Sequence, residues 1–203
     1  LPAQRSNELI ASISRPFQLN CAANATWLIV WHYNLVAFSL LVMLVILTTL
    51  VVIYRRLLVS IGAATLTQHI ALYLPFSLYT AWVTVATIAN ASILQTAYGW
   101  DYVLTSPVQW ALLKLALAGS IAATVVIRTG DVLFALVVAW ACYGISVAQS
   151  ATPAVSGAAT MLSIIALLLA SCSTGIDMPR GTSKGYSSAR LVKRSPDASI
   201  STR

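Results

Sequence analysis

Charged residues are scarce in this chain. Only 8 % of its 203 residues are Asp, Glu, Lys or Arg, while 59 % are hydrophobic. Soluble domains carry about 25 % charged residues, because their surfaces must be covered by groups that water solvates. The scarcity excludes a soluble globular domain and predicts an all-α fold, a polytopic bundle of transmembrane helices.

Catalytic and metal-binding patterns are also missing from the sequence. The three cysteines, Cys21, Cys142 and Cys172, are far apart and lie in apolar runs. They predict neither a disulfide framework nor a metal-ligand set, and we expect them to be small packing residues. No Ser or Cys stands at a recognisable spacing from a base, no span holds a carboxylate pair, and no Gly-rich phosphate loop occurs. The sequence therefore favours a protein that is not an enzyme.

Six apolar runs are long enough to be membrane spans, at about 20 residues per crossing. They cover residues 17–32, 35–54, 67–94, 108–127, 132–149 and 154–172. The first is short, and the third is long enough to tilt or bend. Pro75 predicts a kink in the third span, because proline has no N–H to donate to the carbonyl of Ala71.

Basic residues fall on one side of a six-span arrangement. That side carries eleven of the twelve Lys and Arg side chains: Arg5, Arg15, Arg55, Arg56, Arg128, Arg180, Lys184, Arg190, Lys193, Arg194 and Arg203. Lys and Arg concentrate in cytoplasmic loops. We therefore expect both termini on the cytoplasmic-equivalent side of an organellar membrane (thylakoid or mitochondrial) or a bacterial inner membrane. The twelfth, Lys114, lies inside the fourth span and either snorkels to the interface or forms a partly buried ion pair.

The C-terminal tail, residues 173–203, is rich in Ser, Gly, Lys and Arg. Such a composition builds no core of its own. We expect the tail to be ordered by a partner protein, with binding to anionic lipid headgroups as the alternative. The chain begins with Leu1 rather than Met, which indicates a processed or an incomplete start.

Two spans carry aromatic and polar side chains at helical spacing. In the first span the residues are four, three and four apart: Asn20, Asn24, Trp27 and Trp31. In the third span they are three, four and four apart: Tyr79, Trp82, Ala86 and Asn90. Each set lies on one helical face, so together they can line a slot for a flat, largely apolar ligand. The alternative is helix packing alone, because Asn hydrogen-bonds between membrane helices and Trp and Tyr favour the membrane interfaces.

Small residues also recur four apart, which is typical of close helix packing. The sets are Ala116, Ser120 and Thr124, then Ser156 and Thr160, and Ala159 and Ser163. We expect such faces to contact other helices or other membrane-protein subunits.

His32 and His69 lie near span ends. Each is a candidate axial ligand for a haem iron or a chlorophyll magnesium, the alternative being an interfacial histidine that meets water.

The phrase "YTAWVTVATIAN" at 79–90 resembles the last-helix signature of the translocator protein / tryptophan-rich sensory protein (TspO) family. That signature has a Tyr and a Trp three apart, a run of small residues and Thr, and an Asn eight residues after the Trp. The phrase "NATWLIVW" at 24–31 resembles the family's Asn-x-x-Trp helix, and "LLVMLVILTTLVVIYRRL" at 40–57 fills the helix between. The chain is most similar to longer relatives with extra spans after the signature.

The resemblance implies a helical bundle that binds a tetrapyrrole or a sterol. Carried over, it nominates as ligand-binding residues Asn24, Trp27, Trp31, Tyr79, Trp82, Ala86 and Asn90. It divides the chain into an N-terminal segment (1–16), a TspO-like three-helix part (17–95), a three-helix extension (96–172) and the basic tail. The chain departs from the family where Leu78 replaces the proline before the Tyr, and where the first two family helices, which close the pocket, have no counterpart.

Three functions are compatible with these features. We expect a non-catalytic subunit of a larger membrane assembly, photosynthetic or respiratory, that contacts a tetrapyrrole (haem, porphyrin or chlorophyll), a carotenoid, a sterol or another lipid. The alternatives are a stand-alone tetrapyrrole or sterol sensor or translocator, and a small-molecule transporter. A transporter usually shows an internal repeat or paired broken helices, and here only Pro75 breaks a span. The basic side chains flank membrane spans, so we expect no nucleic-acid partner.

Overall fold

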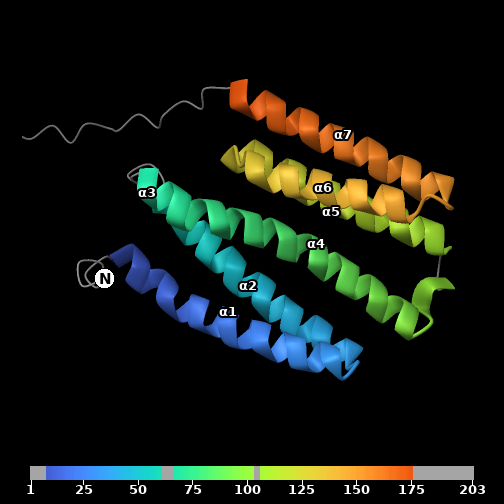
Figure 1. The fold of residues 1–203 in the computed structure, drawn as a ribbon, viewed down its shortest axis with the longest axis horizontal. Helices are drawn as coiled ribbons and strands as arrows, with labels where there is room; N and C mark the ends of the chain where they lie inside the picture. Colours follow the sequence, from blue (N-terminus) through green and yellow to red (C-terminus); the bar gives the residue numbers. More distant parts are fainter. Residues whose placement is uncertain (1–7, 61–65, 103–105, 176–203) are drawn as a thin grey trace, which may run out of the picture.

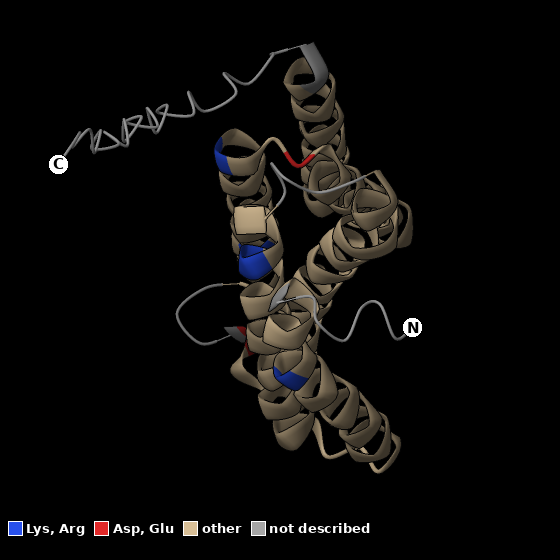
Figure 2. Cartoon of the chain, turned by 90° about the vertical axis from the view of Figure 1, so that its left-hand side faces the viewer, with Lys and Arg blue, Asp and Glu red and all other residues tan. Residues whose placement is uncertain are grey.

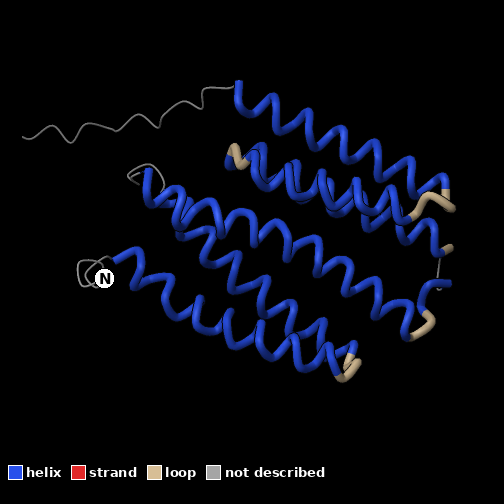
Figure 3. Tube along the Cα trace, in the orientation of Figure 1, coloured by secondary structure: helices blue, strands red, loops and turns tan. Residues whose placement is uncertain are grey.

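The computed structural model describes residues 8–60, 66–102 and 106–175. These residues form six long helices: α1 (Glu8–His32), α2 (Val36–Ser60), α4 (Leu74–Ala97), α5 (Pro107–Thr129), α6 (Val132–Ala148) and α7 (Pro153–Gly175). A short α3 (Leu66–Gln68) and a π-helical segment (His69–Tyr73) run directly into α4, and a 3₁₀ turn (Trp100–Tyr102) follows it. The described residues are helical throughout apart from short turns (Figure 3). This arrangement confirms the predicted all-α bundle.

The helices form two units of three. In the first unit α2 packs between α1 and α4, and in the second α5, α6 and α7 pack on one another, while α4 joins the units by packing on α6. The long helices alternate in direction, so α1 begins and α7 ends at the same end of the bundle (Figure 1). Arg55, Arg56 and Arg128 lie toward this end, which we call the basic end. Figure 2 shows how few charged residues the helices carry.

Four helical segments are long and apolar enough to cross a membrane: Val36–Ser60, Leu66–Ala97, Pro107–Thr129 and Pro153–Ser173. Helix α6 is apolar but has 17 residues, which gives a length of about 26 Å against a hydrocarbon core of about 30 Å. Helix α1 is more polar in its first half, where Ser12, Arg15 and Gln18 lie. The chain is thus an integral membrane protein. That α1 and α6 also span the membrane stays a prediction.

Helix α1 begins nine residues before the predicted start of the first span and contains Pro16. Proline has no N–H, so the carbonyl of Ser12 loses its partner within the helix. The guanidinium of Arg56 on α2 donates a hydrogen bond to that carbonyl, and Ile13 is buried beside Ile53 and Leu57. These contacts with α2 explain why the helix continues through the proline into a segment that the sequence assigned to no span.

The second proline, Pro75, produces a π-helical turn. Because Pro75 cannot donate to the carbonyl of Ala71, the preceding residues, His69–Tyr73, widen to a π-helix, and the N–H of Leu74 bonds the carbonyl of His69 five residues back. Single π-helical turns of this kind interrupt α-helices at irregular positions. The predicted irregularity is therefore present, and its form is a change of helical pitch.

Capping residues define both ends of α5 and the start of α6. Ser106 and Gln109 form a reciprocal capping box at the start of α5, with Pro107 at its first position. Gly130 closes α5 with a left-handed φ of 68°, a conformation that glycine adopts without a steric penalty. The carboxylate of Asp131 then accepts a hydrogen bond from the backbone N–H of Phe134 and caps α6. The α5–α6 turn thus needs only two residues.

The small-residue faces differ in burial: one packs inside the bundle and another lies on its surface. Ala159 and Ser163 are buried, and the Ser163 hydroxyl donates to the carbonyl of Ala139 on α6, which is the packing role we predicted. Ala116, Ser120 and Thr124 lie instead on an exposed face of α5.

Of the cysteines, Cys142 is buried in the core, while Cys21 and Cys172 are exposed. The packing role predicted for all three cysteines is correct for Cys142 alone. Residues 176–203 of the basic tail lie outside the described part of the chain.

Candidate functional site

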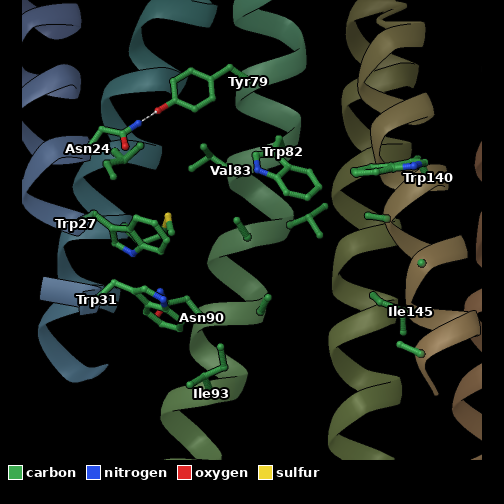
Figure 4. Close-up of a pocket in the computed structure, with 18 of the residues that line it drawn as sticks. Asn24, Trp27, Trp31, Tyr79, Trp82, Val83, Asn90, Ile93, Trp140 and Ile145 are labelled. Atoms are coloured by element: carbon green, nitrogen blue, oxygen red, sulfur yellow. Dashed lines mark hydrogen bonds between the residues drawn. The ribbon is translucent and has the colours of Figure 1, made fainter. Parts of the chain in front are cut away.

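A cavity of about 950 Å³ lies between α1, α2, α4 and α6, in the part of the bundle away from the basic end. The first unit contributes Asn24, Trp27 and Trp31 from α1, Met43 and Ile46 from α2, and Tyr79, Trp82, Val83, Val85, Ala86, Ala89, Asn90 and Ile93 from α4. Helix α6 contributes Trp140, Ala141, Tyr143, Gly144, Ile145, Val147 and Ala148. The cavity is therefore a groove along α4, walled by α1 on one side and α6 on the other (Figure 4).

All seven residues predicted to bind a ligand line this one cavity. They come from two helices that are separated by α2 in sequence, and their helical spacing brings them to facing walls. The two histidines lie elsewhere: His32 ends α1 with its ring against Tyr33, and His69 lies in the π-helical segment with its ring near Tyr73. Neither histidine lines the cavity. Ligand binding by the seven residues stays a prediction.

Two pairs of indole rings mark the walls of the cavity. Trp27 and Trp31 on α1 stack with ring centroids 5.5 Å apart and an interplanar angle of 18°. Trp82 on α4 meets Trp140 on α6 at 5.3 Å and 42°, which places the second pair across the contact between the two helical units (Figure 4). Trp82 is 46 % and Trp140 is 64 % exposed. Both rings therefore leave much of their surface accessible to a molecule that enters the cavity.

The carboxamides of the two stripes have different partners. Asn24 donates through Nδ2 to the hydroxyl of Tyr79, a bond that crosses the cavity end from α1 to α4 (Figure 4). Asn90 accepts through Oδ1 from the hydroxyl of Ser39 at 3.1 Å. Asn20 does not line the cavity, because its Nδ2 donates to the carbonyl of Ile46 at 3.1 Å and to Thr49 Oγ1 at 2.8 Å. The α1 stripe is therefore divided: Asn20 binds α1 to α2, and the next three residues face the cavity.

One polar atom in the cavity wall has no partner. The indole Nε1 of Trp27 is buried and finds no hydrogen-bond acceptor among residues 8–60, 66–102 and 106–175. Leaving a buried donor unpaired costs about 1–3 kcal/mol. An unpaired N–H at this position is a place where an acceptor atom of a ligand would be stabilised.

The α6 wall is the part of the site that the sequence analysis missed. Trp140, Tyr143, Gly144 and Val147 follow one another at three, one and three residues, which is a helical face with two aromatic rings and a glycine. The same spacing argument that selected the α1 and α4 stripes applies here. The face was missed because it carries no carboxamide and because the resemblance ended near residue 95.

The site holds no pattern for acid–base or metal chemistry. Its lining residues are neutral, and within the described ranges no three His, Cys, Asp or Glu side chains cluster as metal ligands. A buried carboxylate lies elsewhere, at the basic end: Asp131 accepts hydrogen bonds of 2.6 Å from the hydroxyls of Tyr54 and Ser77. This carboxylate bridges α2, α4 and the start of α6, away from the cavity.

The fold and the cavity define a polytopic helical membrane protein with a ligand-sized groove between its two helical units. A family model described as TSPO-like protein matches residues 1–172, which include both units, and the chain belongs to the TSPO-like protein family. It is a membrane protein of the TspO type. No curated protein and no solved structure matches the chain.

Proposed function

We propose that this TspO-type membrane protein binds a flat, largely apolar small molecule in the cavity between α1, α2, α4 and α6, and that it does so without catalysing a reaction. The observation that carries the proposal is the convergence of seven residues, chosen from sequence, on a single cavity of about 950 Å³. Small-molecule sites occupy about 300–1,000 Å³ and combine apolar walls with a few polar groups. The cavity has both properties.

The aromatic walls favour a flat ligand. The Trp27–Trp31 pair lies on α1, and the Trp82–Trp140 pair lies between α4 and α6. Indole rings pack with offset or edge contacts that contribute about 0.5–1.5 kcal/mol per pair beyond the area they bury. A planar or sheet-like molecule offers a face to both walls at once.

Ala86 supplies the sharpest test, because its small side chain leaves room in the cavity. Purified protein in lipid nanodiscs is melted with and without a porphyrin and a sterol. A probe at about 100 times its Kd stabilises the folded state by about 2.7 kcal/mol, which raises the melting temperature by about 5 °C or more. Ala86→Leu should abolish this shift.

The matched control is Ala91→Leu, since Ala91 is also half-buried on α4 and does not line the cavity. It should keep the ligand-dependent shift. The proposal is wrong if neither probe stabilises the wild type, or if Ala86→Leu responds to the probes as the wild type does.

A second candidate function is that of a subunit of a larger membrane assembly. It is favoured by the exposed small-residue face of α5, where the hydroxyls of Ser120 and Thr124 donate to carbonyls of their own helix and leave a smooth surface for a partner helix. Ser120→Trp should then reduce the size of the assembly extracted from native membranes. Ile164→Trp, on an exposed face of α7, is the control that should not. Unchanged assembly size in both variants argues against this function.

A further inference from the structure

We propose that the molecule bound in this cavity is uncharged and carries a hydroxyl or carbonyl oxygen that accepts a hydrogen bond from the indole N–H of Trp27. The inference rests on the proposed function and names the chemical class of its ligand. It separates the ligands that the family resemblance leaves open, because acidic tetrapyrroles and neutral lipids make opposite demands on a binding site.

The first argument is the charge of the walls. All twenty lining residues are neutral, and most are aromatic or aliphatic. Burying a carboxylate among such groups is costly unless a cation pairs with it. Lys114 of α5 is not among the lining residues, and neither are Arg55, Arg56 and Arg128, which lie toward the basic end. A ligand with buried carboxylates therefore finds no counter-charge in the described walls.

The second argument is the state of the polar groups in the walls. The Asn24 amide is bonded to Tyr79, and the Asn90 carbonyl oxygen is bonded to Ser39. The Trp27 N–H, in contrast, is a buried donor with no acceptor in the described chain. A donor of this kind is complementary to an oxygen of the ligand and not to another N–H. An acceptor oxygen on a hydrocarbon skeleton therefore matches this donor and the apolar side chains that make up most of the lining.

The third argument concerns access to that donor. Trp31 stacks on Trp27 and is 38 % exposed, so it is a neighbour with room to turn. A rotation of the Trp31 ring away from Trp27 lets a ligand oxygen approach Nε1. Trp82, Trp140 and Tyr143 line the same cavity and are exposed, so their rings are accessible to the apolar body of a ligand whose oxygen reaches Trp27.

The lining also holds neither His nor Cys, the residues that most often bind a tetrapyrrole metal. A sterol, a quinone or an oxygenated carotenoid has the required chemistry: a flat or elongated apolar body with one or two neutral oxygens. A free-acid porphyrin does not, because it carries two carboxylates; its dimethyl ester has the same macrocycle without the charge.

Matched probes test the charge class. Binding of cholesterol and cholesterol sulfate, and of protoporphyrin IX and its dimethyl ester, is measured to the full chain in nanodiscs, with protein-free nanodiscs as the partition reference. We expect the neutral member of each pair to bind at least about tenfold more tightly. Equal or tighter binding of the charged members, lost in Ala86→Leu, overturns the inference and leaves the proposed function standing. Absence of any Ala86-dependent binding by all four probes overturns both.

A second comparison tests the hydrogen bond. Trp27→Phe keeps an aromatic ring and removes the donor, so it should weaken cholesterol binding by about three- to tenfold. It should weaken binding of cholestane, which has the same skeleton without the oxygen, clearly less than binding of cholesterol, because cholestane loses only the contact area of the larger ring. Trp82→Phe is the control for loss of indole area, and it should weaken binding of cholesterol and of cholestane to the same extent. An equal effect of Trp27→Phe on cholesterol and cholestane overturns the assignment of this donor.

Discussion

The hydroxyl of Tyr54 on α2 donates a 2.6 Å hydrogen bond to Oδ2 of Asp131, the residue that caps α6. Ser77 on α4 donates to the same oxygen at 2.6 Å. Asp131 is 3 % exposed, so its carboxyl oxygens are satisfied by these two hydroxyls and by the backbone N–H of Phe134 and not by water. The group ties the two three-helix units together at the basic end, while the cavity lies between the units farther along α4.

Removing the Tyr54 hydroxyl should destabilise the protein. Tyr54→Phe keeps the ring that stacks near Tyr73 and takes one donor from a buried carboxylate, which we expect to cost about 1.5–3 kcal/mol. Reversible unfolding in detergent measures the change. The control is Tyr143→Phe, whose residue is 61 % exposed and should change stability by less than about 0.5 kcal/mol. Equal effects of the two substitutions would show that the Asp131 contact contributes nothing specific.

The first turns of α1 depend on Arg56. Pro16 has no N–H to donate to the carbonyl of Ser12, and the guanidinium of Arg56 donates a hydrogen bond to that carbonyl in its place. Arg56→Gln should therefore increase amide hydrogen exchange over residues 9–15 by about two- to tenfold. Arg55→Gln removes a neighbouring charge with no such bond and should leave the exchange of α1 unchanged. If both variants behave alike, the effect belongs to charge at the basic end and not to this hydrogen bond.

Two asparagines one helical turn apart should have separable effects. Asn20 bonds two groups of α2, so Asn20→Ala should lower the free energy of unfolding by about 1–2 kcal/mol and leave ligand affinity unchanged. Asn24 lines the cavity and holds Tyr79, so Asn24→Ala should weaken ligand binding. A thermal melt and a binding titration on both variants check the pair. Loss of affinity in Asn20→Ala without loss of stability would contradict this division.

The orientation in the membrane can be tested with described positions. Ser60 is the last residue of α2, at the basic end, and Ser150 lies in the α6–α7 turn at the opposite end. In a chain whose native cysteines, Cys21, Cys142 and Cys172, are replaced by alanine, Ser60→Cys should react with an impermeant thiol reagent from the cytoplasmic-equivalent side. Ser150→Cys should react only from the other side. Labelling of both from one side would disprove the six-span topology.

Much of the bundle was predictable from sequence because membrane helices must satisfy their backbone bonds internally. Long apolar runs therefore fix helices directly, and the predicted span 67–94 differs from Leu66–Ala97 by a few residues. The start of α1 was not predictable in this way. Glu8, Arg15 and Pro16 argue against a span, and their helix depends on contacts with Arg56, Ile53 and Leu57 that only the fold brings together.

The candidate site, too, was predictable from the sequence only in part. Helical spacing placed Asn24, Trp27 and Trp31 on one face and Tyr79, Trp82, Ala86 and Asn90 on another, and the fold turns both faces to one cavity. Spacing did not reveal that α6 forms the other wall, because which helices become neighbours is decided by packing between units. It also did not separate Asn20 from Asn24, since that depends on whether α2 or the cavity lies opposite each amide.

The most direct test of the account is to locate a bound neutral lipid. A photoreactive, uncharged sterol is cross-linked to the protein in nanodiscs, and the modified residues are mapped by mass spectrometry. The account predicts saturable labelling within 24–31, 79–93 and 140–148, removed by excess cholesterol but not by excess cholesterol sulfate, and lost in Ala86→Leu. Labelling spread over the exposed faces of α5 and α7, and unaffected by any competitor, would contradict it.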